Sequence, residues 1–265
     1  MSEFQISDEQ SQSFLSSLGI IDVEHSSSGL QVLIRSALEN VPFTNIMMLV
    51  RPKRSPTHDE IIDDMLSLRG GPCGHYNPFM NEVLRHQGFD SNLVAGWIDG
   101  KLSHMAIIVN LNGEEWWADF GNGHPYLSPI KLGSKKVKCH AGLSYRIMMN
   151  PDESYSLEHR LPNMEVFQEN YRFTTNAVPF SFFDEMVESH YTISGFGPFL
   201  GGVRFIRFPE GEMFAVRDDV LMKTTAGMLA KEKIGSVEEM ERIISTGFKQ
   251  ATYPLRAGLG VLGWR

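Results

Sequence analysis

The first third of the chain has its apolar residues at helical spacing. Over residues 29–39 they fall on one face of a predicted helix, formed by Leu30, Leu33, Ile34, Ala37 and Leu38. Two capping-box spacings, Ser7 with Gln10 and Thr57 with Glu60, predict the starts of two further helices. We therefore expect a helical region that ends near residue 88.

Beyond residue 88 the pattern changes to short apolar runs separated by Gly, Pro, Asn and Asp, which is typical of strands in a barrel or sandwich. The later elements predicted are a connecting helix at 181–191, strands at 203–208 and 213–216, and a helix at 237–246. The expected fold class is α+β. The expected parts are a helical domain at 1–88, a β-barrel-like domain at 89–180, an interdomain helix at 181–195 and an α/β domain at 196–265.

Two dipeptides between apolar runs, Asp99-Gly100 and Asn112-Gly113, predict tight hairpins, because type I′ turns need two residues at positive φ. A two-residue turn at the second position makes His104 face Gly121. Asp119 then lies diagonal to His104 on the same face, about 7–8 Å away at Cα and within reach of the ring. A one-residue slip would move the aspartate to the opposite face.

Cys73 follows a Gly70-Gly71-Pro72 turn and precedes residues 78–85, which predict a helix. Its sulfur is therefore expected near a helix N-terminus, where free N–H groups and the helix dipole favour an anion. A cysteine placed there can have its pKa lowered from about 8.5 to roughly 3.5–7.5, which provides a nucleophilic thiolate. The alternative is a buried structural cysteine that fills a small apolar gap.

Together, Cys73, His104 and Asp119 are the parts of nucleophilic acyl chemistry. The aspartate would orient the histidine, and the resulting imidazolium would stabilise the thiolate. Backbone N–H groups near Cys73 and Gly74 are candidates to bind the oxyanion. Taken singly, each residue has a structural alternative: a core cysteine, an ordinary buried histidine, or a turn aspartate.

The run at residues 69–77, Arg-Gly-Gly-Pro-Cys-Gly-His-Tyr-Asn, resembles the Arg-Gly-Gly-x-Cys-x-Glu-x-Asn signature of arylamine N-acetyltransferases. Residues 117–123, Trp-Ala-Asp-Phe-Gly-Asn-Gly, resemble the family's Asp-x-Gly-x-Gly segment. The resemblance is strongest from Gly19 to Pro129, and the chain is identified as a divergent member. The residues that the resemblance places near the site are Arg69, Gly71, Gly74, His75 and Asn77.

The resemblance implies a Cys-His-Asp core like that of cysteine proteases, with residues 196–265 as an α/β lid. It also implies a ping-pong acyltransferase. Cys73 takes an acetyl or related acyl group from acetyl-CoA or another acyl-CoA, and the acyl-cysteine then meets a small amine, hydrazine or hydroxylamine. His104 would remove the proton of that acceptor.

Three departures from the family pattern keep other functions open. His75 and Thr44 stand where the family has glutamates, and the turn at Asp99-Gly100 is shorter than the family's loop before the histidine. An amide synthase that releases or cyclises a chain held on an acyl carrier protein is the closest alternative. A Cys-His-Asp hydrolase, a transglutaminase-like enzyme and an inactive binding module are the others.

Composition and charge argue against several other classes of protein function. The net charge of −8 argues against nucleic-acid binding, which needs a basic footprint. No zinc pattern accompanies the two cysteines, and Cys139 is interpreted as structural. The residues at the N-terminus lack a signal-peptide pattern, and no apolar run approaches the ~18 residues of a membrane span, so we expect a cytoplasmic protein without a membrane partner.

A basic cluster in this acidic chain is the remaining candidate. It consists of Lys131, Lys135, Lys136 and Lys138. These lysines could contact the phosphates of coenzyme A, although a solvated face is the simpler explanation.

Overall fold

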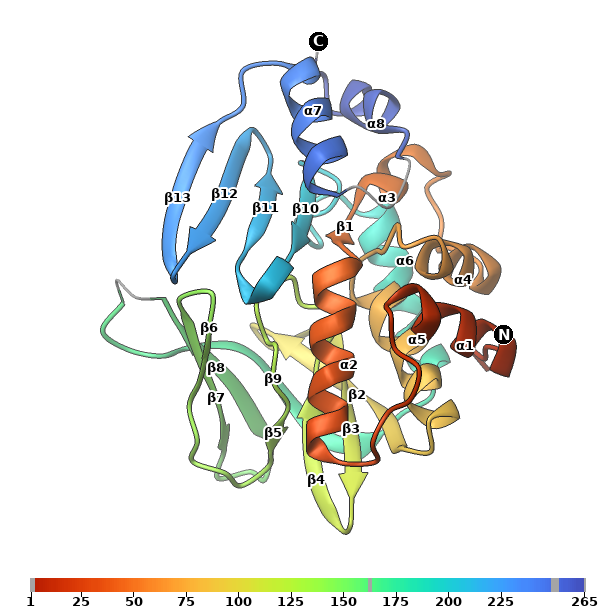
Figure 1. The fold of residues 1–265 in the computed structure, drawn as a ribbon, viewed down its shortest axis with the longest axis vertical. Helices are drawn as coiled ribbons and strands as arrows, with labels where there is room; N and C mark the ends of the chain where they lie inside the picture. Colours follow the sequence, from red (N-terminus) through yellow and green to blue (C-terminus); the bar gives the residue numbers. More distant parts are fainter. Residues whose placement is uncertain (1–2, 162–163, 249–252, 265) are drawn as a thin grey trace.

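The computed structural model describes residues 3–161, 164–248 and 253–264, and its N-terminal part is helical (Figure 1). Both predicted capping boxes are formed, at Ser7 and at Thr57, and each opens a helix. The predicted helix at 29–39 is confirmed and slightly longer. The helices of this part are α1 (Asp8–Ser17), α2 (Ser27–Asn40), α3 (Ile46–Val50), α4 (His58–Leu66) and α5 (Cys73–His86).

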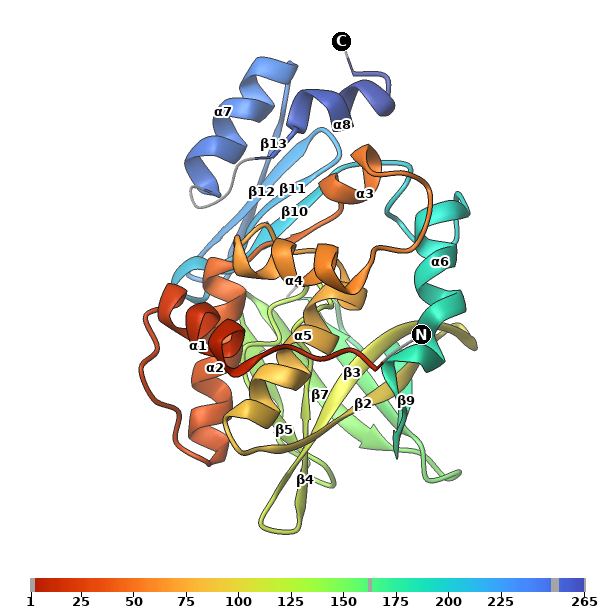
Figure 2. The same ribbon diagram turned by 90° about the vertical axis from the view of Figure 1, so that its right-hand side faces the viewer.

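Helix α5 is the centre of the molecule. It is buried from Cys73 to Leu84, because other helices cover one side of it and strands β2 (Asp90–Ile98) and β3 (Lys101–Leu111) pack against the other (Figure 2). Pro78 lies inside it, five residues after the first. A helix buried on all sides needs apolar residues around its whole circumference, and α5 places the rings of Tyr76 and Phe79 in the main core.

The middle of the chain forms a curled eight-stranded antiparallel sheet. Its order is β5-β4-β3-β2-β9-β8-β7-β6, so the N-terminal hairpins lie at one side and the later meander at the other. Its own core is rich in aromatic residues, among them Trp117, Tyr145 and Tyr171. The further strands are β4 (Glu114–Ala118), β5 (Ile130–Lys131), β6 (Lys138–His140), β7 (Leu143–Met149), β8 (Tyr155–Arg160) and β9 (Gln168–Ala177).

Both predicted hairpin turns are confirmed. Asp99 and Asn112, with the glycines that follow them, have positive φ, as type I′ turns require. The ladder between β3 and β4 has the predicted register but ends at the pair Ile107–Ala118. The prediction that His104 faces Gly121 is therefore wrong, because the chain leaves the sheet after Ala118, and His104 is instead paired with Gly96 on β2.

A second, five-stranded sheet has the order β1-β10-β11-β12-β13 and lies above the first in Figure 1. The predicted strands and helix in this region are confirmed as β10 (Arg204–Arg207), β11 (Phe214–Arg217) and α7 (Val237–Gly247). Sequence reasoning missed β12 (Val220–Thr225), β13 (Met228–Lys233) and α8 (Leu255–Val261). Strand β13 is exposed along its whole length, so it has no apolar alternation to reveal it.

The α+β fold class is confirmed, but one segment crosses the predicted boundary at residue 88. Strand β1 (Phe43–Thr44) pairs with β10, and α3 packs against α8 in the core of the second sheet. The four-part division therefore stays a proposal, with residues 43–50 serving both ends of the chain. The connector consists of a 3-10 turn (Phe180–Phe183) and α6 (Asp184–Thr192), which lies beside β3, and turns follow at 194–200.

The Asn45 side chain links the segment before α3 to the segment that leads into β10. Its buried amide donates to the carbonyls of Phe199 and Gly202, the latter at 2.6 Å, and its oxygen accepts from the N–H of Arg204 at 2.8 Å. Asn45→Ala would leave these backbone groups buried without partners. We expect the free energy of unfolding to fall by about 2–4 kcal/mol in a urea titration. Gln12→Ala on the exposed face of α1 is the control, and equal effects of the two changes would contradict the assignment.

Candidate active site

Cys73 is the first residue of α5 and is buried, with 4% of its surface exposed. Pro72 is the N-cap residue and provides no capping side chain, so the first N–H groups of the helix are not satisfied by one. The loop after β4 packs directly on this point. A Cβ added to Gly121 would come within 2.5 Å of the Cys73 Cα, so only glycine allows this approach.

His104 and Asp119 form a buried ion pair beside that cysteine. His104 Nε2 lies 2.7 Å from Asp119 Oδ2, and the Cys73 sulfur is near enough to the ring to act on its pKa. Burial alone would lower the pKa of His104. The Asp119 carboxylate and the Cys73 sulfur outweigh burial and raise that pKa to about 10. The imidazole is therefore protonated at neutral pH and provides a positive charge next to the sulfur.

Asp119 has a complete set of hydrogen-bond donors. Its Oδ2 accepts from the Tyr171 hydroxyl at 2.9 Å, and its Oδ1 accepts from the Gly121 N–H at 3.0 Å and from Asn77 Nδ2 at 3.2 Å. Trp117 Nε1 in turn donates to the Tyr171 hydroxyl at 2.7 Å. Tyr171 is absent from the predicted site, because a tyrosine 52 positions from its partner carries no spacing signal in the sequence.

Asn77 connects the helix to both strands of the site. Its amide donates to the Met105 carbonyl on β3 at 2.7 Å, and its oxygen accepts from the Phe120 N–H at 3.0 Å. The resemblance places Asn77 near the site, and this geometry gives it a positioning role. It holds α5, β3 and the loop after β4 in one arrangement, so that Cys73, His104 and Asp119 meet.

His75 and Arg69 lie behind the cysteine rather than in contact with His104. His75 Nε2 is 3.3 Å from Asp64 Oδ2, while Arg69 Nε donates to Asp64 Oδ1 at 3.0 Å. Arg51 also donates to Asp64, at 2.9 Å. Burial raises the pKa of Asp64, but His75 and Arg51 outweigh it and hold that pKa at about 2. Asp64 on α4 thus supplies the buried negative charge that the family signature carries two residues after the cysteine.

Packing is tight at both near-site glycines, but only Gly71 is required by it. A Cβ on Gly71 would meet the His75 ring at 2.5 Å, and a Cβ on Gly74 would lie 3.3 Å from Val187 on α6. Gly71 is therefore needed for the His75 position.

The cysteine and the histidine open into a cavity of about 630 Å³ between the two sheets. Aromatic and cationic side chains dominate its wall, which includes Phe43, Lys101, Phe196, Phe199, Arg204 and Arg217. The structure does not bring the predicted lysines there. Lys131 and Lys136 line a separate pocket of about 450 Å³ beside β5 of the eight-stranded sheet. Lys131 is paired with Glu114 at 2.5 Å, and Lys135 is exposed.

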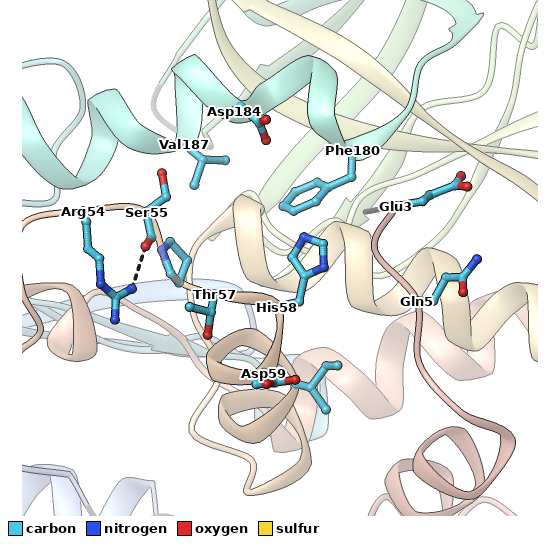
Figure 3. Close-up of a pocket in the computed structure, with 12 residues that line it drawn as sticks. Glu3, Gln5, Arg54, Ser55, Thr57, His58, Asp59, Phe180, Asp184 and Val187 are labelled. Atoms are coloured by element: carbon cyan, nitrogen blue, oxygen red, sulfur yellow. Dashed lines mark hydrogen bonds between the residues drawn. The ribbon is translucent and has the colours of Figure 1, made fainter. Parts of the chain in front are cut away.

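Another cavity, of about 580 Å³, lies where α4 begins (Figure 3). The rings of His58 and Phe180 lie close together in it, and its one guanidinium, that of Arg54, is paired with Glu60 at 2.8 Å. Cys73 and its two partners do not line this cavity. We therefore place the reaction in the larger cavity between the sheets.

A family model described as N-acetyltransferase matches residues 28–251. The chain belongs to the arylamine N-acetyltransferase family. It is similar to an arylamine N-acetyltransferase of Escherichia coli, with 28% identity over 43% of this chain and 43% of that protein, so the match spans less than half of the relative. It is also similar to a protein of Amycolatopsis mediterranei named proansamycin X synthase, with 24% identity over 63% of this chain and 67% of that one.

Solved structures agree on the fold. The arylamine N-acetyltransferase of Salmonella typhimurium superposes with a TM-score of 0.84 at 18% identity, over 98% of this chain and 99% of that one. Among the described residues, no group of three or more His, Cys, Asp or Glu is suited to hold a metal ion, and no helix is long and apolar enough to cross a membrane.

Asp119→Asn removes the negative charge that raises the pKa of His104. The ring then loses its proton at lower pH, and the Cys73 sulfur loses the positive charge beside it. We expect alkylation of Cys73 by iodoacetamide at pH 7 to slow by about tenfold or more. The exposed Asp152→Asn is the control, and equal alkylation rates for the wild type and Asp119→Asn would refute this role.

His75→Glu restores the family residue but places a second carboxylate beside the buried Asp64. We expect it to lower the free energy of unfolding by about 2–4 kcal/mol. Adding Asp64→Ala should recover part of this loss, because the introduced carboxylate can then pair with Arg51 and Arg69. Urea unfolding of the two single variants and the double variant measures the coupling, and simple additivity of the two losses would contradict it.

Proposed function

We propose that this N-acetyltransferase works by a ping-pong mechanism in which Cys73 is the nucleophile, His104 the general base and acid, and Asp119 the residue that orients His104. The observation that carries the proposal is the buried contact of Cys73 with the His104–Asp119 pair at the edge of the cavity between the sheets. Acetyl-CoA, the acyl donor of the family, is the proposed first substrate.

In the first half-reaction the Cys73 thiolate attacks the thioester carbonyl, and the new S–C bond forms as the carbonyl electrons move to oxygen. The His75 N–H is already bonded to the Pro72 carbonyl at 2.9 Å. The N–H groups of Cys73 and Gly74 precede it in the first turn and are the proposed oxyanion donors. Collapse of this intermediate expels the thiolate of CoA, which takes the proton of the His104 imidazolium, and leaves acyl-Cys73 beside a neutral His104.

In the second half-reaction the acceptor amine attacks the acyl-cysteine, and His104 removes its proton. Asp119 stabilises the imidazolium that results. Tyr171 and Asn77 keep the carboxylate in place and satisfy its remaining lone pairs. Breakage of the C–S bond returns the thiolate, so that the ion pair is restored for the next cycle.

The wall of the cavity favours a flat aromatic acceptor. Phe43, Phe196 and Phe199 line it, and ring-on-ring contact suits an arylamine. The tight Asp99-Gly100 turn lies at the same wall and leaves the entrance unobstructed by a long loop. An acceptor or donor larger than the usual small molecules is the second candidate, and the short turn at this wall is the observation that supports it. The carrier-protein partner and the cytoplasmic location remain predictions.

Intact-protein mass spectrometry tests the mechanism. After brief incubation with acetyl-CoA and no acceptor, we expect one acetyl group on the wild type, discharged by an arylamine or a hydrazine. Cys73→Ala should carry none, whereas Cys139→Ala should behave as the wild type, since Cys139 is exposed and lies outside the cavity. An acetyl group on Cys73→Ala would refute the nucleophile. No adduct on the wild type, with an acyl carrier-protein thioester accepted instead, would favour the second candidate.

A further inference from the structure

Two arginines face the reaction cavity from the second sheet. Arg204 on β10 and Arg217 on β11 are direct cross-strand partners, so their side chains project from the same face. Both line the cavity that contains Cys73, together with Ile206, which lies two residues after Arg204 on that face. The intervening pair, Phe205 and Val216, points into the core of the second sheet. The register therefore places both arginine side chains on the side of the second sheet that faces the cavity.

The two arginines differ in how their charge is balanced. Arg204 Nη1 lies 2.6 Å from Asp218 Oδ1 and also donates to the Val203 carbonyl at 2.7 Å. Arg217 makes no side-chain hydrogen bond or ion pair with any described residue, and its Nε is buried without a partner. Like charges directly opposite on neighbouring strands destabilise a sheet. Burial of the Arg217 Nε without a hydrogen-bond partner adds a further cost.

Two further cationic side chains line the same cavity. They are His104, whose pKa is raised to about 10, and Lys101, whose ammonium lies 3.5 Å from the centre of the Phe196 ring. Burial lowers the pKa of Arg217, Arg204 lowers it further, and the carboxylate of Asp218 opposes both effects. Two carboxylates also face the cavity: Asp218 is paired with Arg204, and Asp99 lies in the hairpin turn. No described carboxylate pairs with Arg217.

We propose that Arg217, with Arg204 beside it, binds an anionic oxygen group of a substrate held against Cys73. The chemical class is a carboxylate or a phosphate, because either presents the paired oxygens that a guanidinium recognises. Its source is an acid group on the acceptor amine or a phosphate of the CoA thioester. The assignment of the anion to a substrate rests on the proposed function, whereas binding itself can be measured without turnover.

The same charge balance makes a prediction about stability. A half-buried, unpaired arginine that serves only the fold should stabilise it through the packing of its side chain, so its replacement should be costly. An arginine that serves ligand binding lowers the stability of the ligand-free protein. Removing its charge should therefore leave that stability unchanged or raise it. Arg217→Gln should therefore leave the melting temperature of the free protein unchanged or raise it.

Calorimetric titration of wild type and Arg217→Gln with two matched pairs of probes tests the proposal. One pair is 4-aminobenzoate and 4-aminobenzamide, and the other is CoA and the phosphate-free pantetheine. We expect Arg217→Gln to weaken the anionic member of one pair by about 10- to 100-fold, as for loss of a charged hydrogen bond, and its neutral member by less than about twofold. Arg146→Gln is the control, since Arg146 pairs with Glu158 on the other sheet.

The pair that responds identifies the source of the anion. Equal weakening of both members of each pair, or no weakening of either, would overturn the proposal, as would a marked fall in melting temperature. These outcomes are distinct from failure of the proposed function, which is the absence of an acyl adduct on the wild-type Cys73. Loss of anion discrimination in a protein that still forms acyl-Cys73 with S-acetylpantetheine would establish Arg217 as a specificity residue rather than a nucleophile support.

Discussion

The carboxylate of Asp119 is the point at which the helical and strand regions of this protein are joined. Its two oxygens accept hydrogen bonds from a backbone N–H after β4, an amide on α5 and a hydroxyl on β9, and pair with an imidazole on β3. A buried carboxylate is costly unless each lone pair is satisfied, so all four elements must be correctly placed before this charge is tolerated. The geometry of the reaction site and the stability of the junction are therefore one constraint.

A second buried carboxylate, Asp64, shows how the divergent signature keeps its charge balance. The motif that resembles the family's has lost its glutamate to His75, yet Arg69 remains. Arg69 pairs with Asp63 and Asp64, and Arg51 pairs with Glu60 and Asp64. Asp64 lies between the two arginines and also has His75 as a partner. The arginines behind Cys73 are thus balanced by carboxylates on α4 rather than by one on α5.

Most of the fold, and the core of the site, could be predicted from local signals. The Asn-Gly turn set the register of β3 and β4 as far as Ala118, and the Gly-Gly-Pro turn placed Cys73 at a helix start. A bulge beside Gly96 shifts the β2–β3 register next to His104, and no turn residue predicts it. The Ala226-Gly227 turn that joins β12 to β13 has the same positive φ values, but it lacks the Asn or Asp that predicts such a turn. The strand after it is exposed. Tyr171 was missed for a different reason. It lies 52 positions from Asp119, and only tertiary packing brings the two together. Asp64 and Arg217 were missed because no motif marks them.

The cavity is lined by side chains of different chemical types because it lies between two sheets, and each sheet has its own hydrophobic core. Alternate residues of β10 and β11 are fixed by the second core, which selects for apolar side chains such as Phe205 and Val216. The residues between them face the cavity, where Ile206 packs into the main core and Arg217 is half-buried. Packing limits the nucleophile and its partners closely, because Gly121 and Asn77 leave no spare room. It limits Arg217 on the opposite wall far less than Ile206, and a half-buried position of this kind is where a change of substrate can arise without a change of mechanism.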